Sequence, residues 1–179
     1  MDEPNPAHYR IEAAELSEHL LGELARVYGA ANDPNDDRTR RAMLFAQHAN
    51  EPQWQAIIAG SPVVGFAYGF HCVPGQWWRE TVYEQLRARL GRRRAKRWLA
   101  DTCCLAELHV HPAWQRGGIG QALLTELSEW RTERTMVLST PDRGSAHGFY
   151  RRLGFVELAG SVQFPGNASP YTVFGKSER

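Results

Sequence analysis

The sequence predicts an α/β fold in which a mixed sheet carries helices on both faces. Helical and strand-like hydrophobic patterns alternate along the chain, in the order helix, helix, strand, strand, helix, strand, helix, strand, helix, strand, strand. A glycine-rich turn over 115–120 lies between a strand pattern and an amphipathic helix pattern. The 179 residues suffice for one domain, 1–179, that buries roughly 70% of its unfolded surface.

Two helices and a hairpin are expected in the first part of the chain. Leucines at helical spacing predict a helix over 13–28, which we expect to end at Gly29. A weaker helical pattern covers 37–49, after a loop rich in Asn and Asp. The apolar runs Trp54–Ala59 and Val63–Phe70 flank a Gly-Ser-Pro turn and predict two paired strands.

The middle of the chain combines a long helical segment with a strand. Apolar residues at helical spacing predict a helix over 79–100, and Gly91 is expected to divide it. Thr102–Val110 then returns to a strand pattern. The glycine-rich turn and a further amphipathic helix follow, and Ile119 and Leu123 share the apolar face of that helix.

The C-terminal part alternates strands with one helix. A short buried strand is expected at 136–139, and a helix over 145–153 that Gly154 closes as its C′ residue. Strands over 155–164 and 171–176 complete the sheet, joined by a turn that contains Pro-Gly-Asn.

The composition is that of an ordinary globular protein. Hydrophobic residues make up 42% of the chain and charged residues 23%. The formal net charge of +1 gives no reason to expect nucleic acid or a membrane as a partner. Three cysteines without regular spacing argue against a disulfide scaffold, and no secretory signal or membrane span is visible. We therefore expect a soluble cytoplasmic protein.

The turn over 115–120 has the features of an anion site. The first N–H groups of a helix have no intrahelical partner, and the helix dipole favours a negative charge there. Glycines allow the backbone to approach that charge without a Cβ between them. A tight strand-to-helix connection without a ligand is the alternative. The Walker and Rossmann glycine patterns are both absent.

The residues around this turn resemble motif A of the GNAT family of acetyl-CoA-dependent N-acetyltransferases. Leu108–Pro112 precedes the turn, and Gln115, Gly118 and Gly120 match the motif Gln/Arg-x-x-Gly-x-Gly/Ala. A second block, Ala146–Phe155, looks like motif B of the same family and stands in the expected order.

The resemblance extends over roughly 54–176. It implies the GNAT fold, a central, mixed, mostly antiparallel and splayed sheet with helices on both faces. The implied enzyme transfers acetyl from its co-substrate acetyl-CoA to a primary amine of a small molecule, by direct attack in a ternary complex and without a metal. The alternatives are a protein or peptide N-acetyltransferase and a non-catalytic domain that senses acyl-CoA. Homodimers are common in the family, and the sequence neither supports nor excludes a homodimer.

The resemblance also implies which residues contact the coenzyme. They lie in the strand before the turn, in the turn and near motif B: Leu108, His109, Val110, Gln115, Arg116, Gly117, Gly118, Ile119, Gly120, Ser145 and Tyr150. A backbone N–H at Leu108 or Val110 would polarise the thioester carbonyl. Arg143 stands where many members have an Asn that touches the cofactor, and Ser145 is expected to take over that contact.

Tyr150 and Glu107 are the predicted catalytic residues. Tyr150 holds the motif B position that often protonates the coenzyme thiolate, and a phenol held close to the sulfur can act as that acid. Strand alternation places Glu107 and His109 on one face, where either is a candidate base for the amine. The alternatives are a packed tyrosine, a salt-bridged or substrate-binding glutamate and a structural histidine. His111 lies in the loop and ranks below both base candidates.

An arginine-rich segment over 77–101 is predicted to be a helical insertion, because many members of the family have a tight hairpin there. Within it, a dense basic run consists of Arg87, Arg89, Arg92, Arg93, Arg94, Lys96 and Arg97. The favoured interpretation is a solvated helix face, followed by a site for an acidic substrate or partner and then by a nucleic-acid site. The basic run is flanked by Trp77, Trp78 and Trp98. These side chains either pack the segment onto the domain or line the acceptor pocket.

Overall fold

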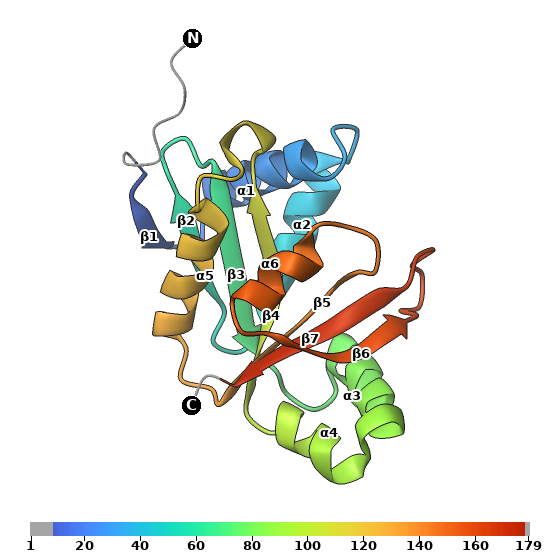
Figure 1. Ribbon diagram of the computed structural model, residues 1–179. Coiled ribbons are helices and arrows are strands. Elements are labelled where there is room, and N and C mark those ends of the chain that lie inside the picture. Colours follow the sequence, from blue (N-terminus) through green and yellow to red (C-terminus); the bar gives the residue numbers. More distant parts are fainter. Residues whose placement is uncertain (1–8, 178–179) are drawn as a thin grey trace. The chain divides into compact units, whose positions relative to one another are not determined.

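The computed structural model describes residues 9–177, which form two compact units (Figure 1). Unit 1 consists of the chain up to Phe70 together with Leu105–Arg131, and unit 2 consists of the remaining residues. The strand β4 (Thr102–Val110) contributes its first residues to unit 2 and the others to unit 1. Each unit contains sheet strands and a hydrophobic core of its own.

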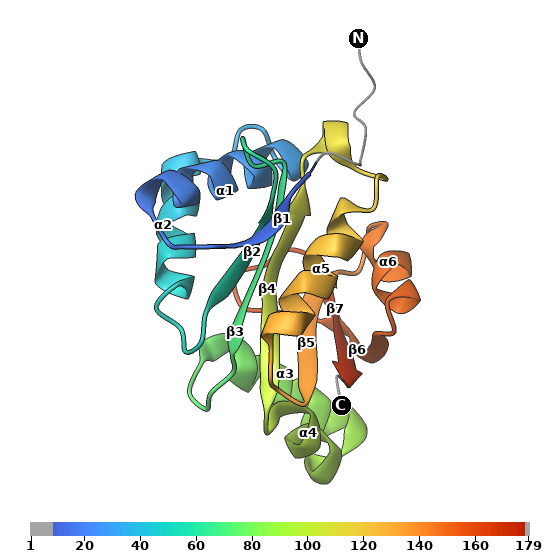
Figure 2. The same cartoon turned by 90° about the vertical axis from the view of Figure 1, so that its left-hand side faces the viewer.

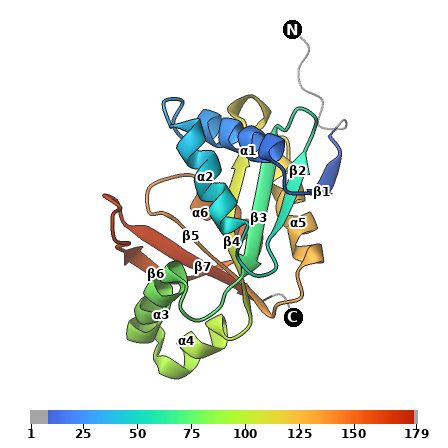
Figure 3. The ribbon, with the colours of Figure 1, turned by 180° about the vertical axis from the view of Figure 1, so that it is seen from behind.

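Unit 1 is a three-layered structure with helices on both faces of its strands. Its elements are β1 (Ile11–Ala14), α1 (Glu18–Ala31), α2 (Arg38–His48), β2 (Gln55–Ala59), β3 (Gly65–His71), the second part of β4, the 3-10 helix η2 (Pro112–Trp114) and α5 (Ile119–Trp130). The strands follow the order β1-β2-β3-β4, and the β1–β2 and β2–β3 pairs are antiparallel. Helices α1 and α2 cover one face of β2 and β3, and α5 covers the other (Figures 2 and 3).

Alternation along β3 explains these layers. Phe66 and Tyr68 are fully buried in a core that α1 and α2 share with the sheet. Gly65 points to the opposite face, where a Cβ would lie 3.1 Å from Ile119 and 3.2 Å from Leu123 of α5. The missing side chain therefore lets the N-terminal turn of α5 pack closely on the sheet.

The prediction of a helix over 13–28 was wrong at both ends. Its first residues belong to β1, an edge strand that pairs with β2, and α1 begins only after Ser17, whose hydroxyl accepts the Leu20 N–H at 3.0 Å. A four-residue edge strand depends on its neighbour and leaves little periodicity in the sequence. The helix also continues through Gly29 to its C-cap Asn32. The second helix is confirmed, with Asp37 as its N-cap.

Unit 2 also places helices on both faces of its strands. Its elements are α3 (Trp77–Leu90), α4 (Arg92–Leu99), the first part of β4, β5 (Thr135–Pro141), α6 (Ala146–Arg152), β6 (Val156–Val162) and β7 (Tyr171–Ser177). The strands follow the order β4-β5-β7-β6. The β4–β5 pair is parallel and the β5–β7 and β6–β7 pairs are antiparallel. The predicted mixed, mostly antiparallel sheet with helices on both faces is therefore confirmed.

Neighbouring residues of β7 face the two helical layers of unit 2. Val173 is buried in a core with Leu86 of α3 and Leu99 of α4. The next residue, Phe174, lies on the other face, where its ring centroid is 6.1 Å from that of Tyr150 in α6. Helices α3 and α4 are thus packed onto the sheet through an apolar face, and their charged residues other than Arg79 are exposed.

The helix boundaries in unit 2 follow the predicted glycines. Gly91 has a φ of 82° and divides α3 from α4. Gly154, with a φ of 88°, ends α6 in a Schellman motif: the Phe155 N–H donates to Tyr150 O and the Gly154 N–H to Arg151 O. The strand predicted at 136–139 is longer, because β5 pairs with β7 from Thr135 to Pro141. Within residues 9–177, no helix is long and apolar enough to cross a membrane.

Candidate active site

The predicted site residues fall in both units, and each group is built within its own unit. In unit 1, β4 leads through η2 into the glycine-rich turn, whose residues from Gln115 to Gly118 are exposed. The Gln115 side chain donates to Val110 O at 3.0 Å and fastens the turn to the end of the strand. His111 is used structurally, because its Nδ1 accepts the Ala113 N–H at 3.2 Å and caps η2.

The N-terminus of α5 is open to an anion. Gly118 is the N-cap in the left-handed region, with a φ of 83°, and no side chain caps the helix. The Ala122 N–H donates to Gly118 O at 3.0 Å, so the N–H groups from Gly118 onward precede this first helical hydrogen bond. The first turn contains no acidic residue that would compete for them. Buried Ile119 anchors this end of the helix to the core, so the donors are held in place.

Glu107 and His109 lie side by side on β4, as strand alternation predicted. The Nε2 atom of His109 is 2.5 Å from Oε2 of Glu107, and both side chains are largely buried, with 18% and 15% of their surface exposed. Nδ1 of His109 lies 3.1 Å from Nδ2 of Asn32, the C-cap of α1. We call Asn32, His109 and Glu107 the Glu107 cluster.

The hydrogen bonds of Asn32 define the tautomer of His109. The Asn32 amide nitrogen also donates to Tyr28 O at 3.0 Å, which identifies it as the nitrogen end of the side chain. Nδ1 of His109 is therefore an acceptor, and Nε2 carries the proton that it donates to Glu107. Both ring nitrogens are thus engaged. Within residues 9–177, the contact with His109 is the side-chain hydrogen bond that Glu107 makes.

Aromatic rings and one cation surround the Glu107 cluster. The His109 ring packs against Tyr28 and Phe66, at centroid distances of 4.8 and 5.5 Å. Cζ of Arg41 lies 3.9 Å above the Tyr28 ring. Arg41 also donates twice to Asp36, and this hydrogen-bonded pair raises the pKa of the guanidinium and lowers the pKa of the carboxyl. The Glu107 carboxylate also contributes to the raised pKa of Arg41, after the hydrogen bond to Asp36.

A second histidine, half-buried, lies next to Tyr68 in unit 1. Nδ1 of His48 is 2.8 Å from the Tyr68 hydroxyl, and burial lowers the pKa of the imidazole. Sequence reasoning missed His48, Arg41 and Asn32. Asn32 stood in a loop with cap candidates, but no local pattern connects it to a strand residue 77 positions away.

Unit 2 contains the motif B residues. Tyr150 of α6 is only 8% exposed, and its ring packs against Phe155 at 5.5 Å and Phe149 at 5.3 Å between centroids. Ser145 is the exposed N-cap of α6, and its side chain makes no capping hydrogen bond. Arg143, at the position where Asn was expected, is exposed. The hydroxyl of Ser145 is therefore accessible at a helix N-terminus.

Comparison with known proteins identifies the family of this chain. The family model of the GNAT acetyltransferase domain matches residues 62–157. A Mycobacterium tuberculosis protein, described as a GCN5-like protein acetyltransferase, is 30% identical, and the alignment covers 89% of this chain and 92% of that protein. The chain therefore belongs to the GNAT family of acetyltransferases, and it is an acyltransferase that uses acetyl-CoA.

Two solved structures of enzymes whose acceptors differ from each other share the fold. An aminoglycoside 6′-N-acetyltransferase in complex with coenzyme A has a TM-score of 0.69 at 15% identity, covering 95% of this chain and 97% of that one. The ribosomal-protein-S18-alanine N-acetyltransferase of Escherichia coli has a TM-score of 0.63 at 18% identity, with 94% of each chain covered. At such identities the likeness concerns the fold alone, and it leaves the acceptor open.

Proposed function

We propose that this protein acetylates a primary amine by direct attack in a ternary complex, with Glu107 as the general base. The observation that supports this role is the hydrogen-bond chain from Asn32 through His109 to Glu107. Because both nitrogens of His109 are engaged, the histidine orients the carboxylate, and the carboxylate is the group left to accept a proton. This assigns the base to Glu107 and a positioning role to His109.

In the proposed reaction, the amine nitrogen forms a bond to the thioester carbonyl carbon and the C–S bond breaks. The amine proton passes to Glu107, directly or through one water. Tyr150 gives a proton to the leaving thiolate. A backbone N–H of Leu108 or Val110 stabilises the carbonyl oxygen as negative charge develops on it.

The glycine-rich turn is the proposed cradle for the coenzyme pyrophosphate. The exposed backbone of Gln115, Arg116, Gly117 and Gly118, followed by Ile119 and Gly120 of α5, offers N–H groups at a helix end without a capping side chain. Ser145 is proposed to replace the asparagine that many members use.

A protein amine is the first acceptor that we propose, on the basis of one relative. The M. tuberculosis relative is described as a protein acetyltransferase, and it aligns along nearly the whole chain. A small-molecule amine is the second candidate, and the largely buried Glu107 carboxylate would suit a compact acceptor. A cytoplasmic location, a single domain over 1–179 and a homodimer are further proposals.

Release of free coenzyme A thiol tests this function. The purified chain is incubated with acetyl-CoA and a panel of lysine peptides, peptides with free N-termini, aminoglycosides, polyamines and amino acids. We expect thiol release that depends on one acceptor class, together with mass-spectrometric detection of the acetylated amine. Binding of acetyl-CoA without turnover of any amine would contradict the proposal and identify a sensor domain.

A further inference from the structure

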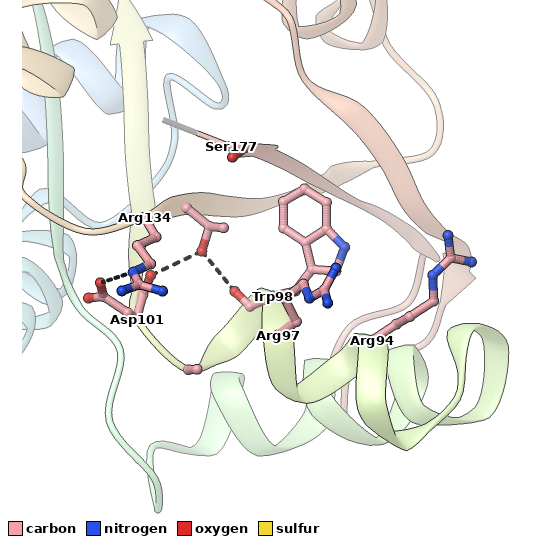
Figure 4. Close-up of a pocket in the computed structure, with 8 residues that line it drawn as sticks. Arg94, Arg97, Trp98, Asp101, Arg134 and Ser177 are labelled. Carbon is pink, nitrogen blue, oxygen red and sulfur yellow. Dashed lines mark hydrogen bonds and ion pairs between the residues drawn. The ribbon is translucent and has the colours of Figure 1, made fainter. Parts of the chain in front are cut away.

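The arginine-rich segment of unit 2 borders a cavity that no step of acetyl transfer uses. The cavity has a volume of about 740 Å³ and lies where α4, the start of β5 and the end of β7 meet (Figure 4). It is lined by Arg94, Arg97, Trp98, Ala100, Asp101, Arg134, Thr135 and Ser177. We call it the arginine cavity. None of its lining residues belongs to the glycine-rich turn, the Glu107 cluster or α6.

The walls of the arginine cavity are held by contacts within unit 2. The Thr135 hydroxyl donates to Trp98 O at 2.8 Å and lies 3.2 Å from Asp101 O, which ties the end of α4 to β5. The Trp98 ring rests on β7, where a Cβ at Gly175 would come within 2.9 Å of it. Glycine at that position permits the contact, so the cavity is formed before any ligand arrives.

Two of the seven arginines of the segment over 77–101 are directed to the cavity by helical spacing. Arg94, Arg97 and Trp98 stand at positions i, i+3 and i+4 of α4 and share one stripe of the helix. Arg92 and Arg93 are exposed as well, yet they do not line the cavity. The same helix therefore provides both the proposed contacts and a matched control.

The charges of the arginine cavity are not neutralised within the described residues. Arg94 and Arg97 form no ion pair there, and Arg134 lies 3.9 Å from Asp101 with 83% of its side chain exposed. Three guanidinium groups and one carboxylate leave the lining with a net charge of +2. Arg87 of α3, by contrast, is paired with Glu84 at 2.7 Å. Like charges around one hollow repel each other, and an anion would relieve that repulsion.

We propose that the arginine cavity binds a phosphorylated small molecule. Guanidinium groups present forked donors that match phosphate oxygens, and three arginines line the cavity, spread along its length (Figure 4). The volume of about 740 Å³ falls in the range of sites for small organic ligands and exceeds what a single ion needs. The half-buried Trp98 supplies an aromatic wall suited to a ring of the ligand.

Calorimetric titration of the full chain tests this site, with inorganic tripolyphosphate and guanosine triphosphate as probes at constant low ionic strength. The Arg94→Gln/Arg97→Gln double variant should bind tripolyphosphate at least about tenfold more weakly. The matched Arg92→Gln/Arg93→Gln variant removes the same charge and should change the affinity less than about twofold. Tighter binding of guanosine triphosphate would identify a nucleotide as ligand, and tighter binding of tripolyphosphate a free polyphosphate.

Asp101→Asn provides a second test that does not remove a ligand contact. Loss of the one carboxylate in the lining should tighten tripolyphosphate binding by about threefold. The site would be contradicted if both arginine double variants weakened binding equally, which would indicate a diffuse surface for a polyanion such as nucleic acid. Displacement of the probes by saturating coenzyme A, or no binding of either probe at about 1 mM, would contradict it as well.

Discussion

The Glu107 cluster of unit 1 and the arginine cavity of unit 2 differ in how far their charged groups are buried and hydrogen-bonded. The carboxylate of Glu107 is 15% exposed and already hydrogen-bonded to His109, which Asn32 holds in turn. The guanidinium groups of the cavity are exposed, and the pair between Arg134 and Asp101 is long, at 3.9 Å. The hydrogen bonds of the Glu107 cluster are thus formed before a substrate binds, whereas the charges of the arginine cavity are exposed to solvent.

The difference fits two kinds of task. Proton transfer needs a base held within hydrogen-bond reach in one orientation, so its supporting contacts must exist before the substrate binds. Capture of an anion needs donors that are still unpaired, and exposed arginines meet that need at the cost of sensitivity to salt. The account therefore predicts that variants in the two regions affect different measurements.

The largest effect in unit 2 is expected at Tyr150, which tests whether that unit contributes chemistry as well as binding. Tyr150→Phe should lower kcat by about 100-fold, because the thiolate loses its proton donor, and should change KM for acetyl-CoA by less than about twofold. Tyr171→Phe removes another hydroxyl from unit 2 and serves as the control. The measurement is steady-state kinetics. An unchanged kcat in Tyr150→Phe would show that another group protonates the thiolate.

A smaller effect is expected at Asn32, which tests whether the Glu107 cluster acts as a chain. Asn32→Ala should reduce kcat by about five- to tenfold and alter the pH profile, because the tautomer of His109 is no longer fixed. The matched control is Asn50→Ala, since Asn50 donates to Ala46 O at 3.0 Å at the end of α2 in the same way. Equal rates for the two variants would show that the contact to His109 is only structural.

The smallest effect concerns stability and His48. Burial lowers its pKa in the folded state, so the folded protein binds fewer protons than the unfolded chain. Its contribution is complete above the unfolded value of about 6.5 and is lost as the pH falls below that value. Thermal unfolding at pH 7.5 and 5.5 should show a smaller loss of stability in His48→Asn than in the parent. An equal loss in both would assign the pH dependence to other groups.

Most of the fold could be predicted from the sequence, because its longer elements have clear periods. The exceptions depend on tertiary partners. Ile11–Ala14 is a strand only because it pairs with β2, and β5 extends beyond its apolar centre because β7 pairs with it along its length. The sequence around Gly29 does not show that the helix continues through it. Gly29 takes up ordinary helical backbone angles there, which any residue can adopt.

The candidate site was predictable where local spacing decides it. Alternation alone put Glu107 and His109 on one face, and the distance of 2.5 Å between them agrees. The division of roles proposed for them was not predictable, because the tautomer of His109 depends on Asn32 and on Tyr28 O at the end of α1. The arginine-rich run was visible as charge, but the separation of Arg94 and Arg97 from their neighbours needs the placement of α4.

The central claim is that Glu107 accepts the amine proton while His109 orients the Glu107 carboxylate. The pH dependence of kcat at saturating acceptor tests this claim. The account predicts that Glu107→Gln lowers kcat by about 100- to 1,000-fold and abolishes the acidic limb of the profile. It predicts that His109→Asn lowers kcat less and keeps that limb. An acidic limb that persists in Glu107→Gln and disappears in His109→Asn would contradict the assignment and make the histidine the base.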